Sequence, residues 1–337
     1  ILVLIELCRR CVGVPILCVL GALLIYTFYN QLSYNPSLYQ ALKNIVYKLF
    51  YTTNGVIGTP VNVCYTYIVL FIIFGAFLER TGIANFFIAL ANRLAGWSAG
   101  GPAKVAVISS ALCGMVSGSS VGNTVTTGSV TIPMMKKTGY HPDFAGAVEA
   151  AASTGGQIMP PIMGAAAFLM AEYMDLPYAT VAVKAILPAV LYFTGIFISV
   201  HLEAKKLGLK GLSKDEMPKW SFLLQKIYLL APLVLLVWLV SSGAKTMQFS
   251  AAVSILAAVI VGFLNKDERL TFKKIFEALE AGAKGAITVG VACAIAGMIA
   301  GCITVTGLAS ILINAIVQLA GSATFIGLIL TMVCCIV

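Results

Sequence analysis

Charged residues are scarce in this sequence of 337 residues. They make up 10% of the chain, whereas hydrophobic residues make up 60%, and the mean hydropathy is +0.96. Soluble domains usually carry about 25% charged residues. The deficit excludes an ordinary soluble domain and predicts an all-α polytopic membrane protein whose surroundings are the lipid bilayer.

Histidine is nearly absent as well, with His141 and His201 as its two occurrences. An intramembrane serine protease built on Ser119 or Ser120 needs a base within reach, and both histidines fall at predicted cytoplasmic boundaries. An intramembrane aspartyl protease needs paired aspartates inside spans, yet the aspartates fall in loops or at helix ends: Asp143, Asp175, Asp215 and Asp267. The sequence also lacks a GxxxxGK[ST] loop for ATP. These absences argue against an enzyme.

The net charge of +9 does not indicate a nucleic-acid partner. The basic residues are confined to a few loops between apolar runs and form no basic face. Most of the nine cysteines lie inside apolar runs, where a thiol behaves as a small hydrophobe. Cys8 and Cys11 form a lone CxxC pair, which is weak support for zinc.

Long apolar runs dominate the sequence. A spanning helix needs about 20 mostly apolar residues, and the candidates are roughly 13–30, 61–78, 177–200, 226–242, 247–264 and 276–303. The runs 103–116 and 121–135 are too short to span, and they are joined by SGSS at 117–120. We expect them to form a re-entrant hairpin over 101–137.

The segment 143–173 shows a second interruption. An Ala-rich helix is predicted through Ala152, followed by STGGQIMPP at 153–161 and another apolar helix. Pro160 and Pro161 remove two backbone donors, so a continuous helix would be costly there. We expect a span that is broken near its middle.

Basic residues indicate how the chain lies in the membrane. Placing every basic loop on the cytoplasmic side gives a consistent path, with a short amphipathic stretch over 37–50 on the outer surface. The order of the parts favours an inverted repeat. The predicted division is a tail at 1–50, a first repeat at 51–201, a cytoplasmic loop at 202–225 and an incomplete second repeat at 226–337. Because the sequence opens without Met and stops inside an apolar run, we expect a piece of a longer protein.

The polar interruptions are candidates for a binding site. Non-helical backbone at membrane depth is tolerated where it is buried in protein or lines a cavity, so SGSS and STGG are expected inside the fold. Their hydroxyls and carbonyls, with the amides of Asn123 and Gln157, suit a reversibly held Na⁺, while half-helix N-termini suit an anion. Close helix packing is the alternative for the small residues. Glu149, one turn before the break, is either a helix-to-helix partner or a proton or cation site.

These motifs resemble a known family. Residues 100–178, with SGS, TTGSVTIPMMKKTGY and ASTGGQIMPPIMGAAAF, closely resemble the large membrane subunit of tripartite ATP-independent periplasmic (TRAP) transporters. The likeness is to fused permeases that work with TAXI-type binding proteins. It implies an elevator-type transporter in the inner membrane that uses Na⁺ as coupling ion, and no other cofactor. It also implies a periplasmic binding protein and a small organic acid as partners. A carrier or channel that works without a binding protein is the alternative.

The resemblance also assigns residues to one half of an ion and substrate site. Gly122 and Thr124 depart from the family pattern, and Thr124 could add an oxygen ligand. Pro160 and Pro161 mark the helix break. The implied ion- and substrate-binding set is Ser117, Gly118, Ser119, Ser120, Asn123, Thr124, Ser153, Thr154, Gly155, Gly156 and Gln157. The implied Na⁺ ligands are Ser117, Ser119, Asn123, Thr154 and Gly155.

Overall fold

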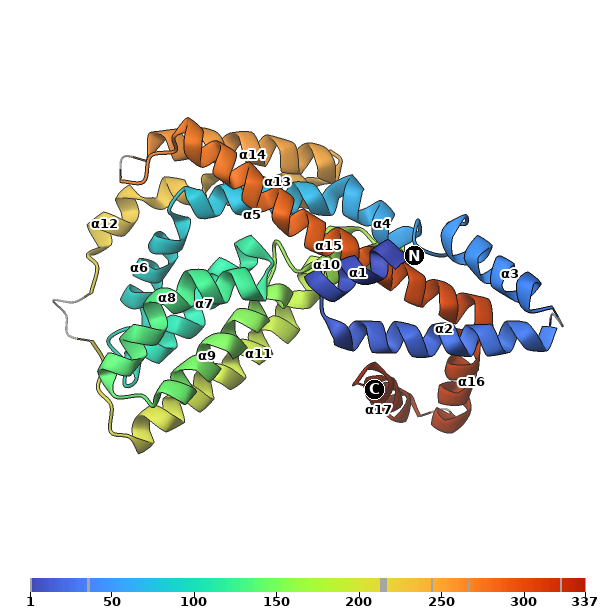
Figure 1. Cartoon of the computed structure of the whole chain (residues 1–337). Coiled ribbons are helices and arrows are strands. Elements are labelled where there is room, and N and C mark those ends of the chain that lie inside the picture. Colours follow the sequence, from blue (N-terminus) through green and yellow to red (C-terminus); the bar gives the residue numbers. More distant parts are fainter. Residues whose placement is uncertain are drawn as a thin grey trace. The chain divides into compact units, whose positions relative to one another are not determined.

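The computed structural model describes residues 2–34, 37–212, 217–243, 245–265, 267–321 and 323–336, and all regular structure in these ranges is helical (Figure 1). This confirms the all-helical membrane class. Asp215 lies outside the described residues. The chain forms two compact units, one of residues 1–62 with 288–337 and one of residues 63–287. These units are defined by spatial contacts and not by sequence repeats, so the predicted division into an inverted repeat stays a prediction.

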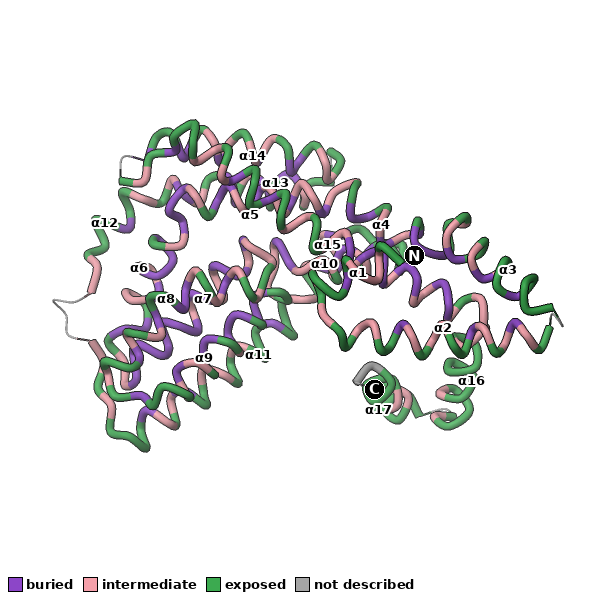
Figure 2. Tube along the Cα trace, in the orientation of Figure 1, coloured by how far each residue is buried: buried purple, intermediate pink, exposed green. Residues whose placement is uncertain are grey.

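The first unit packs around its N-terminal helices and the second half of a long helix, α15. Its elements are α1 (Leu2–Cys11), α2 (Val14–Tyr34), α3 (Leu38–Phe50), α15 (Phe272–Thr306) from residue 288 onward, α16 (Leu308–Ala320) and α17 (Thr324–Ile336). Leu20, Ile295 and Met298 are fully or almost fully buried in its core. Gly297 brings α15 against the chain, because a Cβ there would lie 2.4 Å from the Gly55 carbonyl oxygen. By contrast, α16 has no buried residue (Figure 2).

The second unit holds both polar interruptions. A continuous span, Thr59–Arg80, runs across the boundary at residue 63 into this unit and consists of α4 (Thr59–Val63), the π-helix η1 (Cys64–Ile68) and α5 (Val69–Arg80). The other elements are α6 (Ile83–Ala95), α7 (Gly101–Ser117), α8 (Ser120–Thr138), α9 (Pro142–Gly155), η2 (Gly156–Ile158), α10 (Ala165–Tyr173), α11 (Tyr178–Lys206), α12 (Trp220–Gln225), η4 (Ile227–Leu230), α13 (Ala231–Ser242) and α14 (Met247–Leu264).

Five of the six predicted spans match helices that are long and apolar enough to cross a membrane. The sixth, at 226–242, is a 3-10 turn followed by α13, and it is shorter than these five. The predicted amphipathic stretch at 37–50 is α3. The chain is therefore a multi-pass membrane protein.

Helices α7 and α8 form the predicted helical hairpin (Figure 1). Its turn is tighter than expected, because Ser117 ends α7 and Ser120 begins α8, so that only Gly118 and Ser119 are non-helical. Gly118 adopts φ 60°, a left-handed conformation that glycine tolerates at a helix C-terminus. The Ser119 hydroxyl caps α8 by accepting from the Gly122 amide at 3.2 Å.

The predicted helix break is present at Pro160 and Pro161, but the non-helical segment begins later than the expected residue 153. Helix α9 continues through Ser153, Thr154 and Gly155, and the non-helical segment is 159–164, around Pro160–Pro161. The Thr154 hydroxyl donates to the Ala150 carbonyl at 2.8 Å, which lets a polar residue remain helical. The two prolines, which lack amide donors, end the helix.

Candidate functional site

The hairpin and the broken helix meet through glycine. A Cβ on Gly114 of α7 would lie 2.3 Å from the Gly156 Cα, and a Cβ on Gly156 would lie 2.6 Å from the Gly114 Cα. Neither position has room for a side chain. The two backbones therefore touch where the arm of the hairpin crosses the end of α9, as expected for small residues at a close helix crossing.

Polar bonds continue this contact up to the tip of the hairpin. The Gln157 amide nitrogen donates to the Ser120 hydroxyl at 2.9 Å, and the Ile162 amide donates to the Met115 carbonyl at 3.2 Å. A Cβ on Gly118 would lie 2.9 Å from the Met163 carbonyl oxygen. The hairpin therefore packs against the broken helix at Gln157, Ile162 and Met163.

Tyr178 helps to satisfy the broken backbone. Its hydroxyl donates to the Pro161 carbonyl at 2.7 Å and accepts from the Met163 amide at 3.3 Å. The Gly164 amide donates to the Gln157 carbonyl at 2.7 Å, which closes the turn. A non-helical segment within a membrane requires such internal partners.

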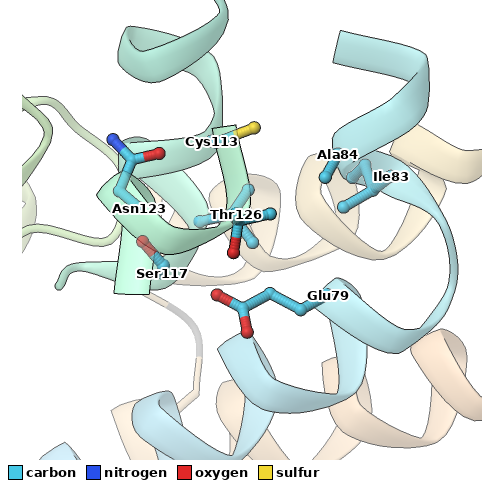
Figure 3. A pocket seen from close by; sticks show the side chains of 8 residues that line it. Glu79, Ile83, Ala84, Cys113, Ser117, Asn123 and Thr126 are labelled. Atoms are coloured by element: carbon cyan, nitrogen blue, oxygen red, sulfur yellow. The ribbon is translucent and has the colours of Figure 1, made fainter. Parts of the chain in front are cut away.

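A small cavity lies beside the hairpin tip (Figure 3). Its volume is about 10 Å³, roughly the space of one water molecule. Oxygen-bearing side chains come from the hairpin and from α5: Ser117, Asn123, Thr126 and Glu79. Figure 3 shows the Glu79 carboxylate reaching toward the hydroxyls of Ser117 and Thr126. Ile83, Ala84, Cys113 and Val116 complete the lining.

Asn123, one of the residues that line this cavity, has an unpaired side-chain oxygen. Its side chain is 1% exposed, and its amide nitrogen donates to the Ser110 carbonyl at 2.8 Å. Because that carbonyl can only accept, the nitrogen must face it and the oxygen must point away. Oδ1 has no hydrogen-bond partner in the described part of the chain. A buried polar atom left without a partner is costly, so Oδ1 is prepared to accept a ligand.

The structure places the other predicted site residues in several environments. Ser119 is exposed at the tip, and Ser120 holds Gln157. The Thr124 hydroxyl donates to the Ser120 carbonyl, as Thr154 does to Ala150. Ser153 donates to Glu149 at 3.1 Å. A Cβ on Gly155 would lie 2.5 Å from the Tyr192 ring. Of the predicted set, Ser117 and Asn123 line the small cavity together.

The comparison with known families decides the identity. The family model described as "Tripartite ATP-independent periplasmic transporter, DctM component" matches residues 1–337. The chain belongs to this family. As a TRAP large permease it is a multi-pass protein of the inner membrane, in agreement with its apolar helices.

Named relatives in this family differ in their substrates. The chain is 26% identical over 203 residues to the C4-dicarboxylate TRAP transporter large permease protein DctM of Pseudomonas aeruginosa, covering 60% of this chain and 47% of that protein. It is 26% identical over 194 residues to the sialic acid TRAP transporter large permease protein SiaM of Vibrio cholerae (57% and 45%). It is 23% identical over 215 residues to the 2,3-diketo-L-gulonate TRAP transporter large permease protein YiaN of Escherichia coli (64% and 50%). The chain spans about half the length of these relatives.

Sequence reasoning missed two residues of the TRAP permease cavity, Glu79 and Thr126. Glu79 lies at the end of the span Thr59–Arg80, where an acidic residue reads as an ordinary solvated helix end. Its side chain is indeed exposed, although it also lines the cavity. The available signal was an acidic residue directly after an apolar run, which marks a functional candidate in a membrane protein.

The side chains around the cavity suit a hard cation. Carboxylate, amide and hydroxyl oxygens are the ligands that hard cations such as Mg²⁺ and Ca²⁺ prefer, whereas transition metals favour imidazole and thiolate. The described residues hold no group of three or more His, Cys, Asp or Glu arranged for a metal ion. A single exposed carboxylate with neutral oxygens favours a weakly held monovalent ion.

Proposed function

We propose that this chain carries one half of the ion and substrate site of a Na⁺-coupled importer for a small organic acid. Membership of the TRAP permease family supports transport as the activity. The substrates in the names of its relatives, a C4-dicarboxylate, sialic acid and 2,3-diketo-L-gulonate, are all organic acids. A periplasmic binding protein, of the TAXI type by the resemblance of residues 100–178, would deliver the substrate.

The observation that carries the proposal is the buried, unpaired Asn123 Oδ1 at a cavity of about 10 Å³. A Na⁺ ion there would receive Oδ1 as a ligand, and Ser117, Thr126 and Glu79 offer further oxygens. Three of these four residues, Asn123, Ser117 and Thr126, are neutral ligands, which hold a cation weakly enough for it to be released, as a transport cycle requires. Ser119, Thr154 and Gly155 stay in the proposed Na⁺ set as backbone or hydroxyl ligands.

An anionic substrate has two helix N-termini available near this point. Helix α8 begins at the hairpin tip and α10 begins after the break, and neither first turn contains an acidic residue. A helix N-terminus carries about half a positive charge, which favours a carboxylate. The substrate acid would then bind beside the Na⁺ whose charge helps to hold it.

Ion movement would supply the energy for uptake. One positive charge that crosses a membrane potential of 100 mV releases about 2.3 kcal/mol, and about 1.4 kcal/mol corresponds to a tenfold concentration ratio. Each Na⁺ therefore supports substantial accumulation without ATP. In the proposed elevator cycle, the hairpin and the broken helix move together, since their backbones touch at Gly114 and Gly156.

Uptake by the full-length permease in proteoliposomes tests this function. With the cognate binding protein present, we expect accumulation of the acid under an inward Na⁺ gradient and none under a matched K⁺ gradient. Equal uptake in both gradients would contradict Na⁺ coupling. Exchange of substrate without any binding protein would favour the alternative, a carrier or channel that works alone.

A further inference from the structure

A second polar cluster surrounds Glu149, where α9 packs against the hairpin helices α7 and α8. This carboxyl group is fully buried on α9, at 0% exposure. Four hydroxyl groups from three helices surround it. Ser110 lies 2.8 Å from Oε1, Ser153 lies 3.1 Å from Oε1 and Thr131 lies 2.5 Å from Oε2, while Thr127 makes the closest contact with Oε1. All four side chains are themselves buried.

No basic side chain pairs with Glu149 in the part of the chain that the structure describes. The buried Lys104 lies on α7, which packs against α9, but its ammonium group donates to the Ser98 hydroxyl at 3.0 Å and not to Glu149. Cys113, also on α7, lies within electrostatic range of Glu149. The Tyr192 hydroxyl of α11 donates to the Ala151 carbonyl. The other charged or titratable residues on the described helices that pack against α9, and on α9 itself, form no hydrogen bond or ion pair with Glu149: Asp143, Lys136, Lys137, Tyr178, Lys184, His201, Glu203, Lys205 and Lys206.

The oxygen atoms of the cluster stand too close together to share a metal ion. A hard cation holds its ligands at about 2.3–2.6 Å, so neighbouring ligands are more than about 3 Å apart. The contacts of Glu149 with Ser110 and Thr131, at 2.8 and 2.5 Å, have the length of O–H···O bonds. The cluster is therefore arranged around hydrogen atoms.

Both protonation states of Glu149 can be fully hydrogen-bonded here. With the carboxylate ionised, all four hydroxyls can donate to it. With a proton on Oε2, the acid donates to Thr131 Oγ1, whose own hydrogen turns to the Thr127 carbonyl at 3.0 Å. Thr127 has the same alternative, the Asn123 carbonyl at 2.8 Å. The change requires only rotation of hydroxyl hydrogens.

We propose that Glu149 is a reversible proton-binding site buried between α9 and the hairpin. It takes its proton from bulk water, and the threonines switch their hydrogens between the carboxyl group and their own helix. The hydroxyls belong to α7, α8 and α9. Binding of the proton therefore removes the negative charge between these three helices and rearranges the hydrogen bonds that connect them. The inference rests on this cluster and not on the proposed Na⁺ coupling.

Infrared difference spectroscopy of the purified full-length protein tests the proposal without any transport measurement. We expect a buried protonated-carboxyl band to grow as the pH falls in the wild type and to be lost in Glu149→Gln. Thr131→Val should shift the frequency of this band, because the acid loses its acceptor. Thr138→Val is the matched control, since its hydroxyl donates to the Met134 carbonyl and does not contact Glu149, and it should leave the band in place.

The outcomes that overturn the proposal are distinct. A Glu149→Gln spectrum identical to that of the wild type would show that Glu149 binds no proton. A band that disappears when Na⁺ replaces K⁺ at constant pH would assign the site to a cation. If Glu149→Gln does not fold, the comparison of Thr131→Val with Thr138→Val decides, and an unshifted band in both would reject the proton site.

Discussion

At the scale of single residues, similar hydroxyl side chains perform different tasks in this permease. Thr124 and Thr154 bond to the carbonyl four residues earlier, which lets them remain helical within apolar surroundings. Thr127 and Thr131 can form the same bond but also reach Glu149. Asn123 differs from all of them, since its side-chain nitrogen is hydrogen-bonded and its side-chain oxygen has no partner in the described part of the chain. Residue type alone does not separate these roles.

The free oxygen of Asn123 leads to a prediction about Na⁺ affinity. Asn123→Ala would remove one ligand of the proposed Na⁺ site, and a bond to a charged group is worth about 1.5–3 kcal/mol. We expect the Na⁺ concentration for half-maximal uptake to rise by about ten- to a hundredfold, as measured in proteoliposomes. Ser129→Ala, which removes an exposed hydroxyl on the same helix, is the control and should not change it. An unchanged Na⁺ dependence in Asn123→Ala would remove this residue from the ion site.

At the scale of secondary-structure elements, the contact between the hairpin and the broken helix depends on two glycines. Gly114→Ala would place a methyl group 2.3 Å from the Gly156 Cα, and overpacking of this kind costs about 1–3 kcal/mol. We expect a lower thermal unfolding temperature in detergent and a loss of uptake, because the added methyl group would push the hairpin away from the broken helix with which it moves in the proposed cycle.

Gly146→Ala on α9 is the matched control for this substitution. A Cβ at Gly146 meets no atom within 4 Å, and alanine stabilises a helix interior by about 0.5–1 kcal/mol relative to glycine. Its unfolding temperature should stay the same or rise. If Gly114→Ala behaves like Gly146→Ala, the two elements do not pack as described.

The same elements show how far the sequence alone can predict the structure. Hydropathy placed the hairpin and five spans, because lipid imposes length and polarity on each helix separately. The helix break was predicted correctly at Pro160 and Pro161, but its start was placed too early, at Ser153, because glycine was weighted as a helix breaker although α9 continues through Gly155. The contacts of Glu149 with Ser110, Thr127 and Thr131 could not be predicted, because they join residues that are distant in the sequence.

At the scale of the whole molecule, the distribution of basic residues predicts which side of the membrane each loop faces. The predicted path places all basic loops in the cytoplasm and the short connection between α13 and α14 outside. Helix α11 ends in Lys205 and Lys206, which fits a C-terminal end at the cytoplasmic surface. Lys245, before α14, would lie on the opposite side despite its charge, because its neighbouring spans leave no other position.

Cysteine labelling in intact cells tests this orientation. In a cysteine-free full-length background, a membrane-impermeant maleimide should label Lys245→Cys, while Lys210→Cys should react only after the inner membrane is permeabilised. The spans α11, α13 and α14 place the two positions on opposite sides of the membrane, and the positive-inside rule predicts that the side of Lys210 is cytoplasmic. Labelling of Lys210→Cys from outside would invert the topology. The hairpin would then enter the membrane from the periplasm, and the proposed ion site at Asn123 would load from the opposite side of the membrane.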